Sequence, residues 1–376
     1  MSHIKNIEIK NFKSIRHSKI EDCRRVNVFI GYPNVGKSNI LEALSTFSIN
    51  NETKSVTDFI RIGKPTTLFF NGNVDEPAEI ILNNIFRAKL AHEQFGISAN
   101  FQIDRYTEGF SKIDTELKAQ NFSSRSDIED KIPSLGRFDI SEGNLEVRNF
   151  SANDNFRVYQ EESKDFLQLS TYKKISLLKY EFRKETIYDS KNSWGLKQPS
   201  GKNLFEIIFT KKELGDEISE LFKEYNLNFF YDTSSQDYKI MKIIGSSIFT
   251  VPFFMTADTL QRLIFHKAAI ASNKNSVLLF EEPEAHMFPP YISKFTADVN
   301  YDENNNQFFI ATHSPFVLND FMEDMDKENL AIYTVGYRKE TGETVVRRIT
   351  DGEIDEIYQY GIDLFFNLEN FLKDAV

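Results

Sequence analysis

The stretch Gly31-Tyr32-Pro33-Asn34-Val35-Gly36-Lys37-Ser38 decides the fold of this 376-residue chain. It has the pattern G-x-x-x-x-G-K-S. An apolar run (26–30) precedes it, and an amphipathic segment (37–47) follows it. A strand, a glycine-containing turn and a helix in this order make a phosphate loop. The stretch therefore predicts an α/β protein with a nucleotide at the carboxyl edge of its sheet.

The residue types in this loop fit a bound triphosphate. Gly31 and Gly36 let the backbone turn tightly and bring its N–H groups close to phosphate oxygens. The helix that starts at Lys37 adds unpaired N–H groups, the Lys37 amine can reach the β- and γ-phosphates, and the Ser38 hydroxyl can bind Mg²⁺. The residues that we expect to contact ATP here are Gly31, Pro33, Asn34, Val35, Gly36, Lys37, Ser38 and Asn39.

A second motif is an apolar strand, 277–280, that ends in Glu281 and Glu282. Glu281 would bind Mg²⁺ together with Ser38, and Glu282 would orient and deprotonate the attacking water. Paired acids also occur in ordinary turns. The continuation Pro283-Glu284-Ala285-His286 favours the functional interpretation.

A third motif, Ala311-Thr312-His313-Ser314-Pro315, follows the apolar run 308–311. A histidine at this strand end would contact the γ-phosphate, although a lone histidine after a strand is more often structural. The candidate catalytic residues are thus Lys37, Glu282 and His313. A glutamine that senses the γ-phosphate would be Gln94 or Gln102, between which the sequence does not choose.

Composition limits the partners. The net charge of −11 disfavours a protein coated in basic surface for DNA. One cationic cluster is more simply a solvated face: Lys173, Lys174, Lys179, Arg183 and Lys184, with Lys197 and Lys202 nearby. The single cysteine fits a reducing cytoplasm, and the apolar runs are too short to span a bilayer, so we expect a cytoplasmic protein without a membrane partner.

The predicted organisation has three parts. An N-terminal lobe (1–160) carries the phosphate loop and a β-rich subdomain with expected strands at 66–70, 79–83 and 98–103. An inserted helical subdomain (161–235) has expected helices at 162–190 and 204–225. A C-terminal lobe (236–376) carries the second and third motifs.

The ordered set GYPNVGKS, LLFEEPEAH and ATHSP resembles the ABC-type ATPases of the RecF, SMC and OLD group. The opening IKNIEIKNFKSI is similar to the group's N-terminal strand. The resemblance covers about residues 1–48 and 247–350. It implies a phosphate-loop ATPase fold in which two subunits sandwich ATP and Mg²⁺, so we expect a homodimer or a higher homo-oligomer.

The resemblance also places a signature loop at 254–262. There Thr256 would replace a serine, and Asp258 stands where the family has glycine, which predicts slow or partner-stimulated hydrolysis. Only 61 residues follow Pro315, too few for the Toprim nuclease domain of OLD proteins. The chain is therefore similar to stand-alone relatives in anti-phage systems. By this resemblance we expect a separate effector protein, for which a nuclease is one candidate, and DNA or a phage component as a further candidate partner. Two alternatives are a RecF-like repair ATPase that clamps DNA and a nucleotide-gated scaffold with little hydrolysis.

Overall fold

The computed structural model describes residues 3–49, 55–84, 86–93, 96–104, 144–153, 158–159, 176–189, 195–235 and 237–372. Its central feature is a six-stranded sheet. In sheet order its strands are β16 (Glu343–Arg348), β15 (Leu330–Arg338), β3 (Val26–Ile30), β14 (Gln307–Ala311), β13 (Ser276–Glu281) and β9 (Ser176–Tyr180). All neighbours pair in parallel except β15 and β16. The expected strands at 26–30, 276–280 and 308–311 are confirmed.

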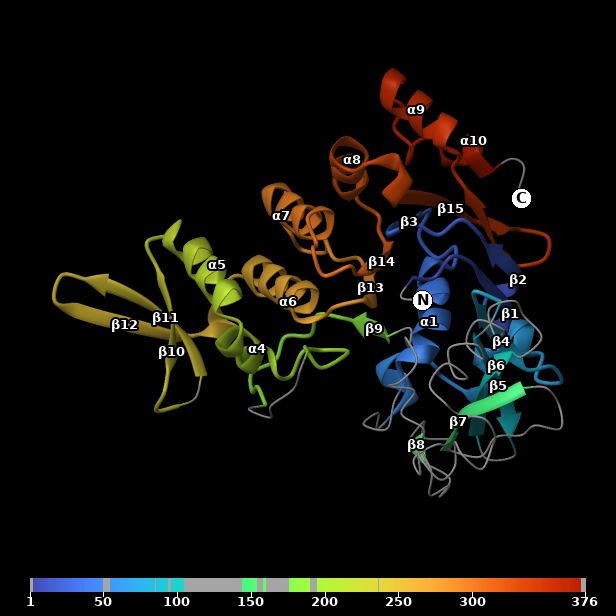
Figure 1. Ribbon diagram of the computed structural model, residues 1–376, viewed down its shortest axis with the longest axis horizontal. Helices are drawn as coiled ribbons and strands as arrows, with labels where there is room; N and C mark the ends of the chain where they lie inside the picture. Colours follow the sequence, from blue (N-terminus) through green and yellow to red (C-terminus); the bar gives the residue numbers. More distant parts are fainter. Residues whose placement is uncertain are drawn as a thin grey trace, which may run out of the picture.

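The central strands are apolar along their whole length because both faces of the sheet are covered. Val28 and Phe280 face helices α6 (Asp258–Ser272), α7 (Pro289–Asn300) and α8 (Pro315–Asp324), whereas Phe29 and Leu279 face helix α1 (Lys37–Ser45). Figure 1 shows α6, α7 and α8 side by side on one side of the sheet and α1 on the other. The α/β phosphate-loop class is confirmed.

A second, seven-stranded antiparallel sheet packs against α1. In sheet order its strands are β2 (Ile15–Ile20), β1 (Ile7–Phe12), β4 (Ala78–Leu82), β5 (Phe86–Glu93), β6 (Gly96–Asp104), β7 (Asn144–Asn153) and β8 (Val158–Tyr159). The expected strand at 66–70 is wrong, because Pro65–Leu68 is a 3₁₀ helix that begins at a proline. Proline favours the first turn of a helix and cannot donate to a strand ladder.

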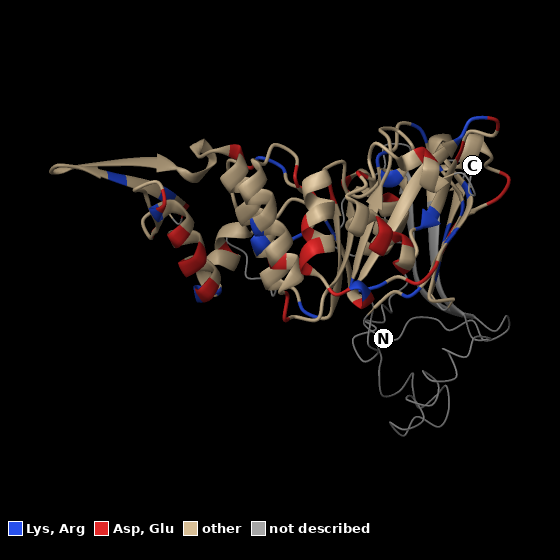
Figure 2. Cartoon of the chain, turned by 90° about the horizontal axis from the view of Figure 1, so that it is seen from above, with Lys and Arg blue, Asp and Glu red and all other residues tan. Residues whose placement is uncertain are grey.

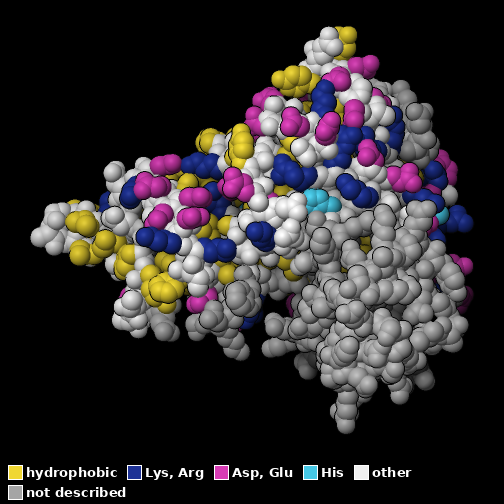
Figure 3. All heavy atoms as spheres, in the orientation of Figure 1, with side chains coloured by type: hydrophobic (Ala, Val, Ile, Leu, Met, Phe, Trp, Pro, Cys, Tyr) yellow, Lys and Arg dark blue, Asp and Glu magenta, His cyan; other side chains and the backbone are white. Residues whose placement is uncertain are grey.

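A wing projects from the end of the α6–α8 layer (Figures 1 and 2). It consists of helices α4 (Leu204–Thr210) and α5 (Lys212–Lys223) and a sheet of β10 (Asn228–Asp232), β11 (Asp237–Ile244) and β12 (Ser247–Pro252). The single helix expected at 204–225 is thus two helices separated at Lys211. Exposed apolar side chains gather on the wing (Figure 3), among them Ile243, Ile248 and Phe249.

The helix expected at 162–190 is wrong where the structure describes it. Ser176–Tyr180 is strand β9, which pairs in parallel with β13 at the edge of the central sheet. Its run of apolar residues fits a short buried strand as well as a helix, and periodicity alone does not separate the two. Residues 160–175 lie outside the described residues, and the division of the chain at 160 and 235 stays a prediction.

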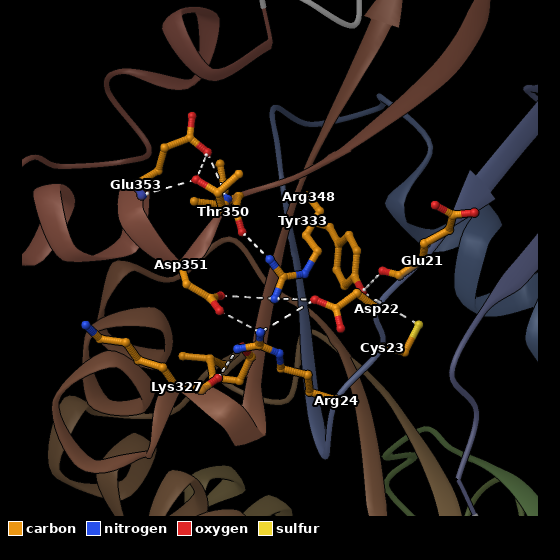
Figure 4. Close-up of polar contacts among 12 residues, drawn as sticks. Glu21, Asp22, Cys23, Arg24, Lys327, Tyr333, Arg348, Thr350, Asp351 and Glu353 are labelled. Atoms are coloured by element: carbon orange, nitrogen blue, oxygen red, sulfur yellow. Dashed lines mark hydrogen bonds and ion pairs between the residues drawn. The ribbon is translucent and has the colours of Figure 1, made fainter.

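The chain closes with helices α9 (Asp351–Tyr360) and α10 (Leu368–Leu372). A network of charged side chains ties α9 to the segment before β3 (Figure 4). Arg24 contacts Asp351 at 2.7 Å, and Arg348 contacts Asp22 at 2.9 Å and Asp351 at 3.2 Å. Beneath it, the Tyr333 hydroxyl donates to the carbonyl of Glu21 at 2.8 Å. The network holds β3, which leads into the phosphate loop, beside β15.

Candidate functional site

The phosphate loop lies between the carboxyl end of β3 and the first turn of α1. Its backbone is left-handed at Asn34 (φ 65°) and at Gly36 (φ 104°). A Cβ atom on Gly31 would lie 2.3 Å from the carbonyl oxygen of Val335, and one on Gly36 would lie 2.1 Å from Thr344 Oγ1. Close packing therefore requires glycine at both positions, and at Gly36 the left-handed backbone of the turn requires it as well.

Two residues that the sequence did not single out support the loop from behind. The Thr344 hydroxyl donates to the carbonyl of Val35 at 2.8 Å and lies 2.6 Å from Ser14 Oγ. The Asn39 side-chain amide also donates to Ser14 Oγ, at 2.6 Å. Asn39 thus binds the turn between β1 and β2 in this structure. No motif marks Thr344, and Ser14 lies in the opening stretch IKNIEIKNFKSI without a role that the sequence assigns to it. Their role follows from the pairing of distant strands.

Lys37 is the buried cation of the loop, with 5% of its surface exposed. Its amine donates to the carbonyl oxygens of Gly31 and Tyr32, each at 2.9 Å. Burial lowers the Lys37 pKa to about 8, against the opposing charges of Glu282, Glu281 and Glu284. The amine is thus held inside the loop by neutral acceptors, which an anionic ligand can replace.

Glu282 and His313 meet at the edge of the sheet. The strands that precede them, β13 and β14, are parallel neighbours with Glu281 opposite Ala311. Glu282 has a left-handed backbone (φ 45°), and its N–H donates to the Ala311 carbonyl at 2.8 Å. His313 Nε2 lies 3.5 Å from Glu282 Oε1. Burial, and then the charge of Lys37, lower the His313 pKa, so the neutral imidazole is favoured.

Glu281 is linked through the exposed Arg61 to the buried Glu42. Arg61 Nη2 contacts Glu281 Oε1 at 3.2 Å, and Arg61 Nε contacts Glu42 Oε1 at 2.5 Å. The fully buried Glu42, on α1, also pairs with Lys13. These contacts connect Glu281 through Arg61 to Glu42 on α1, the helix whose second residue is Ser38. Arg61 carries no sequence signal, because a single arginine after an apolar pair is common.

Thr256 and Asp258 lie elsewhere on the chain. Thr256 follows the 3₁₀ helix Phe253–Met255, and its hydroxyl donates to the Phe253 carbonyl at 2.7 Å. Asp258 is the first residue of α6 and accepts from Arg262 at 2.8 Å. Their described contacts are thus within the α6 region, not with the phosphate loop.

The remaining sequence candidates have no described place in the site. Gln94 lies outside the described residues, and Gln102 is on β6, opposite Arg87 in the second sheet. Of the cationic cluster, Lys173 and Lys174 are also outside the described residues. The Lys179 amine is buried and donates to the Phe59 carbonyl at 2.9 Å, and Arg183 pairs with Glu181 at 3.3 Å.

Among the residues that the structure describes, no three His, Cys, Asp or Glu side chains gather in a way that could hold a metal ion. None of the described helices is long and apolar enough to cross a membrane.

Known proteins are similar to this chain over short segments. The DNA replication and repair protein RecF of Thermoanaerobacter sp. (strain X514) is 31% identical over 64 residues, which are 16% of this chain and 18% of RecF. An ATP/GTP phosphatase of Helicobacter pylori (strain ATCC 700392 / 26695) is 46% identical over 41 residues, 11% of each protein. The chain thus spans less than a fifth of the length of either relative.

Among solved structures, an SMC head bound to the C-winged helix domain of ScpA aligns with a TM-score of 0.48 and 15% identity. The alignment covers 93% of this chain and 99% of that one. The family model described as "AAA domain, putative AbiEii toxin, Type IV TA system" matches residues 26–319, which is well over half of the chain. The matched region runs from β3, before the phosphate loop, into α8, after His313. The chain belongs to this AAA-domain family.

Proposed function

We propose that the chain binds ATP at the carboxyl edge of the central sheet and hydrolyses it to ADP and phosphate. One observation carries the proposal. The neighbouring strands β3, β14 and β13 end side by side, and the residues after them supply Lys37, His313 and Glu282. The Glu282–His313 contact of 3.5 Å supports a single site, as do the effect of the Glu282 charge on the Lys37 pKa and the effect of the Lys37 charge on the His313 pKa.

The residues present fit a nucleotide with Mg²⁺. The loop offers backbone N–H groups, the start of α1 and a buried amine, a donor set suited to phosphate. Ser38 and Glu281 offer the metal one hydroxyl and one carboxylate. Mg²⁺ commonly takes one or two protein oxygens and completes its shell with phosphate and water, so the described residues need no larger acidic cluster. When bound, Mg²⁺ would neutralise charge on the phosphates.

Each catalytic candidate has a role that its environment supports. Glu282 is half exposed and would accept a proton from the attacking water. His313, favoured as the neutral imidazole, would hydrogen-bond the γ-phosphate. Lys37 would exchange its two carbonyl acceptors for phosphate oxygens and carry positive charge to where negative charge develops.

We further propose that two or more copies assemble around ATP. Thr256 and Asp258, at the start of α6, have described contacts only within their own region and none with the phosphate loop of their own copy. A second copy could present the start of its α6 to the γ-phosphate. Asp258 would place a negative charge there, which supports slow or partner-stimulated turnover.

We also propose that this ATPase gates a separate effector protein in defence against phage. The family description, which names a toxin of a toxin–antitoxin system, supports a two-component arrangement. The exposed Ile243, Ile248 and Phe249 on the wing support contact with a protein partner, since exposed apolar clusters of this kind mark interaction sites. The experiment expresses the chain alone and together with the product of a neighbouring gene. If the chain gates an effector, growth should stop only when both proteins are expressed. If the chain is itself toxic, growth should stop when it is expressed alone.

The ATPase proposal is tested by measuring phosphate release from ATP with Mg²⁺, at several protein concentrations. Turnover per protomer should rise with protein concentration and disappear when EDTA removes Mg²⁺. Tight ATP binding with no phosphate release, with or without the neighbouring gene product, would leave a nucleotide-gated scaffold instead.

A further inference from the structure

Glu284 is the second acid after β13, and it has no part in the proposed metal site or as the proposed base. Its carboxylate is turned inward. Glu284 Oε1 accepts a hydrogen bond from Thr312 Oγ1 at 2.6 Å and a second from the His313 backbone N–H at 3.0 Å. Glu284 therefore binds the backbone of the loop that carries His313. Glu282, two residues earlier in the chain, contacts the imidazole ring of the same histidine.

The Thr312 hydroxyl makes two of the hydrogen bonds that hold this loop. It donates to Glu284 and accepts from the Ser314 N–H at 2.9 Å, while the Thr312 N–H donates to the Phe29 carbonyl on β3 at 3.1 Å. The segment 312–314 is thus attached to β3 on one side and, through Glu284, to the turn after β13 on the other. Without the carboxylate, the second attachment is lost.

The turn that carries Glu284 reaches the start of α6. The Ala285 N–H donates to the Glu282 carbonyl at 3.0 Å, and the Met287 N–H donates to the Glu284 carbonyl at 2.8 Å. His286 has a left-handed backbone (φ 60°), and its carbonyl accepts from the Thr259 hydroxyl of α6 at 2.9 Å. Hydrogen bonds of one turn thus connect α6 to the His313 loop.

We infer that Glu284 is a positioning residue, which sets His313 against Glu282 and couples it to the start of α6. The inference rests on the proposed ATPase function. Under that function, α6 is where a second copy meets the nucleotide. A shift of α6 would move His286, the turn and therefore the His313 loop. The position is unfavourable for a charged carboxylate. Glu284 Oε2 is buried without a hydrogen-bond partner among the described residues, and burial raises the Glu284 pKa.

The test compares two variants of Glu284 in the full-length chain. Glu284→Gln keeps a carbonyl oxygen that accepts from Thr312 and from the His313 N–H, so kcat should stay within about threefold of the wild type. Glu284→Ala removes the acceptor, so kcat should fall about 10- to 100-fold while the Kd for a fluorescent ATP analogue stays within about threefold. Glu303→Gln, at an exposed acid on the same protein, is the control.

A second readout does not depend on turnover. In protein labelled with ¹⁵N only at histidine, the His313 imidazole signal should shift in Glu284→Ala and keep its position in Glu284→Gln. If the wild type does not hydrolyse ATP, the proposed function is overturned, but the His313 signals of the two Glu284 variants can still be compared. An unchanged kcat and His313 signal in Glu284→Ala would overturn the positioning role, as would an equal loss in both variants.

Discussion

His313 Nε2 and Glu282 Oε1 lie 3.5 Å apart, although they belong to motifs far apart in the sequence. The contact exists because β13 and β14 are parallel neighbours with Glu281 opposite Ala311, so both strands end at the same edge of the sheet. A proton acceptor and a neutral imidazole are thereby placed side by side, next to the loop that holds Lys37.

Replacing Lys37 should weaken nucleotide binding and stop hydrolysis. In Lys37→Ala the buried amine and its charge are lost, and charge-assisted hydrogen bonds to phosphate are among the stronger ones in proteins. We expect the Kd for ATP to rise on the order of 10- to 100-fold and phosphate release to fall below detection. Titration with a fluorescent ATP analogue measures the Kd. Lys274→Ala, at an exposed lysine, is the control and should bind as the wild type does.

Replacing Glu282 should stop hydrolysis and keep binding. Glu282→Gln retains shape and hydrogen bonding but cannot accept the proton, which typically costs 10²- to 10⁴-fold in rate. The variant should therefore collect in the ATP-bound assembly, which light scattering detects as a larger mass with ATP than without it. Glu303→Gln should hydrolyse ATP at the wild-type rate. Normal turnover in Glu282→Gln would exclude Glu282 as the base.

The support behind the phosphate loop should affect affinity more than rate. Thr344→Val is close in shape but loses the hydroxyl that donates to the Val35 carbonyl and contacts Ser14. One buried hydrogen bond of this kind contributes about 1 kcal/mol, so we expect the Kd for ATP to rise about 3- to 10-fold. The rate at saturating ATP should change little. Thr341→Val, in the exposed turn before β16, is the matched control, and equal losses in both variants would contradict the loop-support role.

A pH effect on stability is expected at the contact between α6 and α7. Burial raises the Asp298 pKa to about 6, against the opposing charge of Lys267 at 2.7 Å, while the nearby Glu217 raises it further. The folded chain then binds a proton that the unfolded chain releases near pH 3.8. This contribution is present below the unfolded pKa and is lost as the pH rises through the folded pKa.

The variant Asp298→Asn isolates this effect. Its stability relative to the wild type should increase between pH 4 and pH 6.5 and then level off, by up to about 3 kcal/mol for a shift of about two pKa units. Urea midpoints of both proteins across this range measure the difference. Parallel curves for the two proteins would show that Asp298 does not titrate between pH 4 and pH 6.5.

Much of this site can be predicted from the sequence because each of its motifs is a short continuous segment. The phosphate loop, the acids after β13 and the histidine after β14 each sit at the end of an apolar run, and parallel strands bring such ends together. The supports are different. Thr344, Ser14 and Arg61 act through contacts between segments that are distant in the sequence. Their residue types are common, and although Ser14 lies in the opening stretch that resembles the family, only the folded structure identifies what each of them contacts.

Both wrong expectations concern short segments whose local sequence fits more than one secondary structure. Ser176–Tyr180 was expected to be helical because a short apolar run fits either structure, and its place at the edge of the central sheet decides for a strand. The segment 66–70 was expected to be a strand, whereas Pro65 and the Thr67 side chain, which accepts from the Lys64 N–H at 3.4 Å, favour a 3₁₀ turn. Local composition was ambiguous in both cases.

A crystal structure of the Glu282→Gln variant grown with ATP and Mg²⁺ tests the central claim most directly. We predict one triphosphate along residues 31–38, with its γ-phosphate against the Lys37 amine, between His313 and the side chain at position 282, and with the start of α6 from a second copy facing it. A triphosphate bound elsewhere, or Lys37, His313 and position 282 turned toward separate regions, would contradict the account.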